Sequence, residues 1–391
     1  MPRTTARPIQ DGTRTGKGRG IGTYTKRVSG VLAAGAAAAL VLPAGAGLAA
    51  TDPQQTNVFV RMDLASDNPM LTPTADPNIV NPWGVSEFPH GPLWVSNEGH
   101  ANTTLYSGAD SSSAKLNPVG LVVSIPGGRP TGQAFNTTVT GGSPGFSVTD
   151  GKTKAPAVFL FATLNGTIAG WAPTVGGTAQ NPSTMAQQAA MVPRAVFTGL
   201  AQSGNRLYAA DVAHRTVDVF GPDFTLLNMP GAFQDPFIPR GFSPFNIAAV
   251  NGQIVVTYSS PHAFLGGGFV DVFTPSGVLV KRLVRRGLLD QPWGMALAPS
   301  DFGPLAGDLL IGNHGNGRIN AYNPVTGRFA GTLTLTSGRA FTAPGLWGLI
   351  LGDGPAAPGG PPSAGDFDTL FFTAGATPGR HGLIGEITRP A

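Results

Sequence analysis

The sequence predicts an all-β fold in which six copies of a small sheet form a closed ring. A short motif, usually an aromatic residue followed by a small one, recurs about every 50 residues, and strand-like runs separated by turn residues follow each copy. Glycine and proline are abundant, at 56 and 36 of 391 residues, which disfavours long helices. Repeats of this length with about four strands each are typical of a six-bladed β-propeller.

The small residue of the motif has a structural reason in such a ring. The first strand of every blade lines the central channel, where neighbouring backbones crowd together, and glycine permits the closest approach. The aligned copies are Trp83-Gly84, Gly132, Gly199, Phe245-Asn246, Trp293-Gly294 and Trp347-Gly348.

The strands between these copies are marked by periodicity and turns. A lone strand is expected from Asn57 to Leu64, and it needs a partner to stay ordered, so we expect it to close the ring by pairing with the last repeat. Asn165-Gly166 predicts a tight hairpin in the second repeat. Alternating valines in residues 216–220 and 269–273 predict half-buried strands, and residues 352–365 predict a surface loop.

The amino end has the pattern of a secretory signal peptide. Residues 1–27 are basic, residues 31–42 are apolar but too few to span a bilayer, and small residues follow up to Ala50. We expect cleavage after Ala49 or Ala50, with an uncleaved anchor as the alternative. The domains are therefore a signal peptide at 1–50 and a propeller at 51–391, in a secreted, extracellular protein with no membrane association after cleavage.

Charge and cysteine content limit the partners and the chemistry. The whole chain carries +4, but residues 1–50 carry +6 (seven basic residues and one acidic), which leaves −2 for residues 51–391. No nucleic-acid partner is expected from that balance. The absence of cysteine excludes a disulfide framework and a thiolate nucleophile. No nucleophile elbow, phosphate loop or zinc-protease helix motif occurs.

The aromatic residues of the motif allow two interpretations. They fill the wedges between blades, or they line a ligand site at the channel mouth. The ligand-binding candidates are Trp83, Phe245, Trp293, Trp347, His100 and His381.

Histidines and side-chain oxygens offer a second set of candidates. Five histidines fall in turns between second and third strands, at His100, His214, His262, His314 and His381. Three residues at the ends of second strands could hold a divalent cation such as calcium through oxygen, or could merely form turns, namely Asn97, Asp211 and Asn313.

Several of these motifs resemble a family of uncharacterised secreted bacterial propellers that often end in a PEP-CTERM sorting tail. The resemblance rests on segments along residues 57–388, among them 82–84, 93–96, 208–211, 243–247, 268–273 and 381–385. It implies an exported six-bladed propeller with NHL-like repeats and implies no reaction. This chain lacks the tail, so release from the cell is expected. His314 stands where the family has an aromatic residue.

Two functions remain open at this point. The first is a binding module that uses the central-channel face to hold an extracellular ligand or protein. The alternative is a metal-assisted hydrolase or lyase, similar to lactonase propellers, with Asn97, Asp211 and Asn313 as ligands. Lactonase-like propellers have a glutamate at the start of the first blade, whereas this chain has Asn81-Pro82-Trp83 there.

Overall fold

A computed structural model of the chain describes residues 57–110, 113–142, 144–262, 264–354, 363–375 and 380–390, all within the unit Pro53–Ala391. The signal peptide expected at residues 1–50 lies outside the described residues. Strands dominate, and the helical elements are the 3-10 turns η1 (Glu98–His100), η2 (Thr137–Val139) and η3 (Gly303–Leu305). No helix of this described part is long and apolar enough to cross a membrane.

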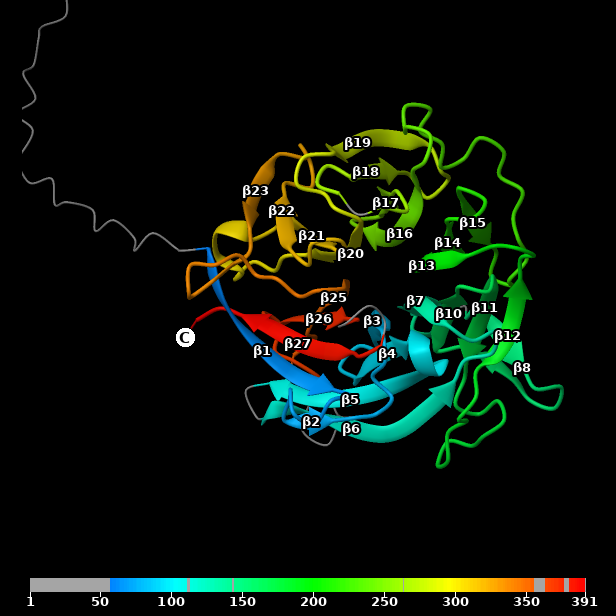
Figure 1. Cartoon of the computed structure of the whole chain (residues 1–391). Coiled ribbons are helices and arrows are strands. Elements are labelled where there is room, and N and C mark those ends of the chain that lie inside the picture. The colour runs from blue at the N-terminus through cyan, green and yellow to red at the C-terminus, as the bar shows by residue number, and fades with distance from the viewer. Residues whose placement is uncertain are drawn as a thin grey trace, which may run out of the picture. The chain divides into compact units, whose positions relative to one another are not determined.

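Six sheets surround a common axis, which confirms the predicted six-bladed propeller (Figure 1). The first blade contains β3 (Pro82–Glu87), β4 (Leu93–Asn97), β5 (Asn102–Asp110) and β6 (Ser113–Ser124). The second contains β7 (Pro130–Phe135), β10 (Phe159–Thr163), β11 (Thr167–Trp171) and β12 (Gln187–Met191), with a small hairpin, β8 (Ser147–Thr149) and β9 (Lys154–Pro156), in the connection from β7 to β10.

The next blades follow the same order from the axis outward. The third contains only β13 (Phe197–Ser203), β14 (Arg206–Asp211) and β15 (Thr216–Phe220). The fourth contains β16 (Ser243–Val250), β17 (Gln253–Ser259), β18 (Gly268–Phe273) and β19 (Leu279–Arg285). The fifth contains β20 (Pro292–Leu297), β21 (Leu309–Asn313), β22 (Ile319–Tyr322) and β23 (Phe329–Thr332).

The third blade departs from the expected four strands. The N–H of Leu227 bonds to the carbonyl of Val219 at 2.8 Å, so a fourth strand begins beside β15. It stops at Pro230, which has no N–H to donate, and Gly231, whose φ of 79° turns the chain away.

The sixth blade is completed by the amino-terminal strand, as predicted. It contains β25 (Leu346–Leu351), β26 (Leu370–Ala374), β27 (Leu383–Thr388) and, outermost, β1 (Val58–Ser66). β1 runs antiparallel to β27, with Val60 opposite Thr388. Two short strands flank β1 in parallel, β2 (Thr74–Ala75) and β24 (Thr334–Leu335). The ring is therefore closed by a strand far away in sequence (Figure 1).

The motif glycines lie where adjacent inner strands touch. A methyl group placed on Gly84 would meet the backbone of Thr131 in the next blade, and one on Gly348 would lie 2.7 Å from the carbonyl oxygen of Trp83. Gly132, Gly199 and Gly294 meet the following blade in the same way. In the fourth blade Asn246 takes this place and its side chain bonds to the fifth blade. The expected close approach is thus confirmed around the ring.

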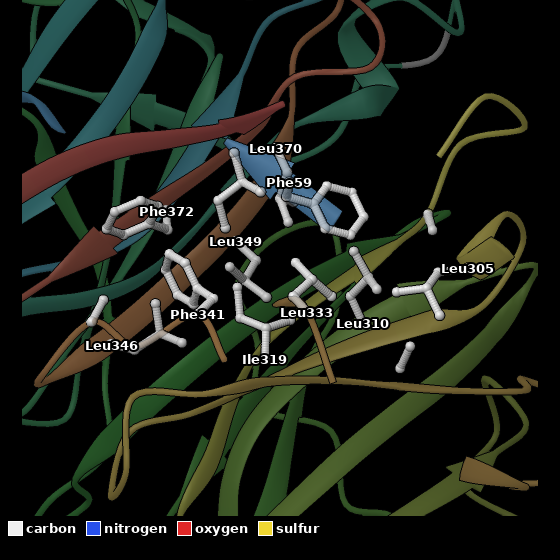
Figure 2. Packing of buried hydrophobic residues seen from close by; sticks show 14 of the residues in the cluster. Phe59, Leu305, Leu310, Ile319, Leu333, Phe341, Leu346, Leu349, Leu370 and Phe372 are labelled. Carbon is white, nitrogen blue, oxygen red and sulfur yellow. The ribbon is translucent and has the colours of Figure 1, made fainter. Parts of the chain in front are cut away.

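Apolar clusters fill the spaces between adjacent blades. Figure 2 shows the cluster in which the fifth and sixth blades meet β1. Phe59 of β1 is fully buried there, and its ring centroid lies 4.7 Å from that of Phe302. β1 therefore adds core packing as well as backbone hydrogen bonds to the closure.

A tryptophan plate and a central cavity

Three tryptophans from different blades meet at the axis. The rings of Trp83 and Trp347 are stacked with centroids 3.6 Å apart, and Trp293 meets both edge-on, at 6.0 Å from Trp83 and 5.7 Å from Trp347. Phe245 lies 6.0 Å from Trp347. Each occupies the same position in its inner strand, one residue before Gly or Asn, so the repeat itself brings them together. We call these four residues the tryptophan plate.

The plate is packed rather than open. The exposed fractions of Trp83, Trp293 and Trp347 are only 7%, 4% and 5%. Trp293 Nε1 donates to the Thr198 carbonyl at 2.9 Å, and Trp347 Nε1 donates to Asn81 Oδ1 at 3.0 Å. The aromatic rings thus fill the channel at this end, and Phe245 is the partly exposed member.

A cavity of about 230 Å³ continues along the axis beyond the plate. Residues of all six inner strands line it, and they include Trp293 at one end and residues 248–249 of β16 further along. The cavity therefore extends from the plate toward the carboxyl ends of the inner strands. Since an innermost strand is a sheet edge, its unpaired N–H and C=O groups face this space.

The polar side chains of the cavity are amides held in fixed orientations. Gln133 donates to the Trp94 carbonyl and accepts from Ser96 Oγ at 2.8 Å. Asn246 Nδ2 donates to the Trp293 carbonyl at 2.7 Å, and Gln202 Oε1 accepts from Thr137 Oγ1 at 2.7 Å. The described lining contains no ionisable side chain. The cavity thus offers hydrogen-bond donors and acceptors without charge.

The histidines occupy the turns that the sequence indicates, but one of them reaches the plate. His314 is stacked on Trp347 with ring centroids 3.7 Å apart, and burial lowers its pKa to about 4. His100 is exposed, and His381 lies 2.6 Å from Asp67 Oδ2 through its Nδ1. No contact among the described residues joins either of these two to the plate.

The cation candidates lie in three different blades and are engaged in local hydrogen bonds. Asp211 Oδ1 accepts from the N–H groups of Val196, Ala213 and His214 at 3.1, 2.9 and 3.2 Å. Asn313 Oδ1 accepts from the Asp290 N–H at 3.1 Å. These contacts are typical of turn-forming Asx side chains.

The remaining cation candidate, Asn97, is fully buried and donates to Asn102 Oδ1 and Thr104 Oγ1, both at 2.9 Å. In the described part of the chain, no three His, Asp or Glu side chains form a group that could hold a metal ion.

A polar network beside the plate was not anticipated from the sequence. Asn81 Nδ2 donates to Glu98 Oε2 at 2.8 Å, and Arg129 Nε donates to Glu98 Oε1 at 2.5 Å. Through Asn81 this network reaches Trp347. Glu98 is buried, whereas the side chain of Arg129 is 59% exposed. The residues come from three separate connections, so no local motif reveals them.

Comparison with known proteins gives relatives without a stated activity. No family model matches the chain. It is 32% identical over 328 residues to "Uncharacterized protein R648" of Acanthamoeba polyphaga mimivirus, covering 80% of this chain and 76% of that protein. It is 30% identical over 341 residues to "Uncharacterized protein L690" of the same virus, covering 83% and 84%.

Solved structures with a related arrangement are more distant in sequence. A Bacteroides thetaiotaomicron protein of unknown function has a TM-score of 0.49 at 12% identity, covering 86% of this chain and 73% of that one. Virginiamycin B lyase from Staphylococcus aureus has a TM-score of 0.47 at 11% identity, covering 85% and 100%.

Proposed function

We propose that this chain, which belongs to the same family as the uncharacterised mimivirus proteins R648 and L690, is a binding module that holds a small, neutral, polar ligand in its central cavity. The observation that carries the proposal is the cavity of about 230 Å³ on the axis, with walls of backbone edges and oriented amides. The tryptophan plate closes one end, so the ligand enters from the opposite end.

Size and polarity define the class of ligand. Sites for drug-sized molecules occupy roughly 300–1,000 Å³. The smaller volume here suits a molecule no larger than about a monosaccharide, such as a polyol or a small amide. Gln133, Gln202 and Asn246 supply both donors and acceptors, and a charged ligand would find no opposite charge in the described lining.

Binding is favoured over turnover by the same lining. General acid–base catalysis requires an ionisable group within hydrogen-bond reach of the reacting atom. The ionisable side chain that contacts the plate is that of His314, whose pKa is lowered and which stacks on Trp347. The metal-assisted hydrolase or lyase remains an expectation from the sequence, and the hydrogen bonds of Asp211 and Asn313 give it no support.

A cavity-filling variant tests this function. Ala248→Leu places a larger side chain at a lining position, whereas Ala213→Leu makes the same change in an exposed turn. We expect a panel of monosaccharides and polyols to raise the melting temperature of the parent chain and of Ala213→Leu but not of Ala248→Leu. If no panel member stabilises the parent chain, or if Ala248→Leu responds equally, the cavity is not the ligand site.

Export belongs to the proposal as well. It rests on the signal-like pattern of residues 1–50 and on the resemblance to secreted bacterial propellers. Expression in a bacterium, followed by mass measurement of chain recovered outside the cytoplasm, tests it. A mature chain that begins near Thr51 supports export, and an intact amino end in the cytoplasm contradicts it.

A further inference from the structure

Exposed arginines gather on one face of the propeller. This face, which we call the tryptophan face, contains the turns between second and third strands and the connections that lead into the innermost strands. Its arginines come from every blade or its junctions and are all exposed, namely Arg129, Arg194, Arg215, Arg240, Arg285, Arg286, Arg318 and Arg380. They are far apart in the sequence, and the propeller topology alone places them on one side.

The acidic residues of this face are mostly buried, and one of them, Glu98, pairs with Arg129. Asp76, Glu98, Asp211 and Asp290 are buried, with exposed fractions of 8%, 8%, 0% and 7%. The side chain of Asp67 is 12% exposed and lies against His381. Burial also raises the pKa of Asp290. The exposed formal charge of the described part of this face is therefore strongly positive.

The opposite face has a different character. Its connections expose charges of both signs, namely Asp150, Asp223 and Asp301 together with Lys115, Lys152, Lys154 and Arg328. Charges of both signs are therefore mixed on the opposite face, whereas exposed arginines predominate on the tryptophan face. Arginines that are not interspersed with exposed carboxylates create a positive field, which attracts anionic surfaces to the tryptophan face.

Large apolar side chains stand beside the arginines. In the fourth blade, Phe264 and Leu265 are 43% and 63% exposed, and Leu288 is 37% exposed. The N–H of Gly266 bonds to the carbonyl of Leu289 at 2.8 Å, which holds these two loops together next to Arg286. Elsewhere on the tryptophan face, at the end of β12 in the second blade, Met191 is 59% exposed. We call Phe264, Leu265, Arg285, Arg286 and Leu288 the blade-four tip.

We propose that the tryptophan face docks on an anionic phospholipid bilayer. Arginine forks bind phosphate oxygens in bidentate fashion, and basic residues near such a surface are attracted to its negative potential. Acidic polysaccharides and nucleic acids would also attract the arginines, but they would leave Phe264 and Leu265 in water. A bilayer accepts apolar side chains at the depth of its headgroups, beside the basic residues that bind those headgroups.

Vesicle sedimentation with the full chain tests the proposal. We expect binding to vesicles of phosphatidylcholine with roughly 30% phosphatidylglycerol, weak binding to phosphatidylcholine alone, and loss of binding as salt rises above about 0.5 M. The double variant Arg285→Gln with Arg286→Gln should bind roughly 10- to 30-fold more weakly. Phe264→Ser with Leu265→Ser should also weaken binding.

The opposite face provides matched controls. Lys152→Gln with Lys154→Gln removes the same charge, and Val278→Ser with Val325→Ser removes exposed apolar side chains, at 62% and 72% exposure. Both double variants should bind vesicles as the parent chain does. Equal weakening by the two charge variants would overturn the assignment of the tryptophan face.

The orientation of the bound chain distinguishes docking through the tryptophan face from binding through the basic residues of the amino end. The chain has no cysteine, so a single environment-sensitive dye can be attached at Asn165→Cys on the tryptophan face or at Thr153→Cys on the opposite face. Only the dye at position 165 should shift on vesicle binding. A response at both positions or at neither, or tight binding to heparin or DNA without binding to vesicles, would overturn the proposal.

Discussion

Trp347 Nε1 donates a hydrogen bond of 3.0 Å to Asn81 Oδ1 across the seam at which the last blade meets the first. The two residues are 266 positions apart in the chain. Asn81 has a φ of 46°, and its Nδ2 donates to Glu98. One amide therefore fixes the plate, the start of the first inner strand and a buried carboxylate together.

Replacing Asn81 by glycine isolates these hydrogen bonds. Glycine adopts the left-handed backbone readily, so Asn81→Gly removes the side-chain contacts without backbone strain. We expect the free energy of unfolding to fall by about 1–3 kcal/mol in a urea titration, because the buried partners lose their bonds. Gln291→Gly, at the matching position of the fifth blade with a φ of 51°, should cost less. If both variants lose the same free energy of unfolding, the hydrogen bonds of Asn81 across the seam give no additional stability.

Phe59 should dominate the contribution of β1 to closure. It is fully buried between the fifth and sixth blades, so Phe59→Ala leaves a cavity in the core of Figure 2 and should cost about 3–5 kcal/mol. Met62 lies in the same strand but is 41% exposed, so Met62→Ala should cost less than about 1 kcal/mol. Urea titration of both variants checks the difference, and similar losses would mean that the backbone pairing alone closes the ring.

Stability should fall as the pH rises from about 5 to about 8. Burial raises the pKa of Asp271 to about 7, with Asp235 adding to the effect, and burial raises those of Glu386 and Glu87 to about 7 and about 8. The folded state thus holds protons that the unfolded chain has released, and the stability they give is lost as pH passes the folded pKa values. His314, whose pKa is lowered from 6.5 to about 4, has the opposite effect and offsets part of this decline below about pH 6.5.

The measurement is a series of urea titrations from about pH 5 to about pH 8, over which the free energy of unfolding should decline and then level off. Asp271→Asn keeps the shape of the side chain and removes its titration. The decline should then be smaller by up to about 1.4 kcal/mol per pH unit where Asp271 titrates. A stability that rises over this range would show that these carboxyls are already ionised in the folded state.

Asp211 should stabilise its turn without a metal ion. Its Oδ1 accepts three backbone N–H groups and its Oδ2 lies 2.6 Å from His214 Nδ1. Asp211→Ala leaves those N–H groups without their acceptor, and we expect a loss of about 2–4 kcal/mol. The loss should be the same with calcium and with a chelator. A loss that appears only with calcium would restore the metal-assisted function.

Some contacts of the fold follow from the spacing of the repeats, and others do not. The motif spacing predicted that the glycines lie where neighbouring inner strands crowd, and the approach of Gly348 to the Trp83 carbonyl across the seam is one such contact. The missing strand of the third blade was not predicted, since the end of pairing at Pro230 depends on which partner strand lies beside it. The stacking of His314 on Trp347 could not be predicted either, because it depends on how the fifth and sixth blades are placed against each other.

The sequence by itself determined the all-β class, the six repeats and the closure by β1, because these follow from local periodicity and from the size of one repeating unit. The sequence also shows every arginine, but these residues are spread along a segment, 51–391, whose net charge is close to zero. Only the tertiary structure decided that these arginines share one face while the acidic residues beside them are buried. The physical reason is that alternate turns of every blade lie on the same side of a propeller. Residues far apart in the sequence therefore share a face, and the distance between them in the sequence does not indicate which face that is.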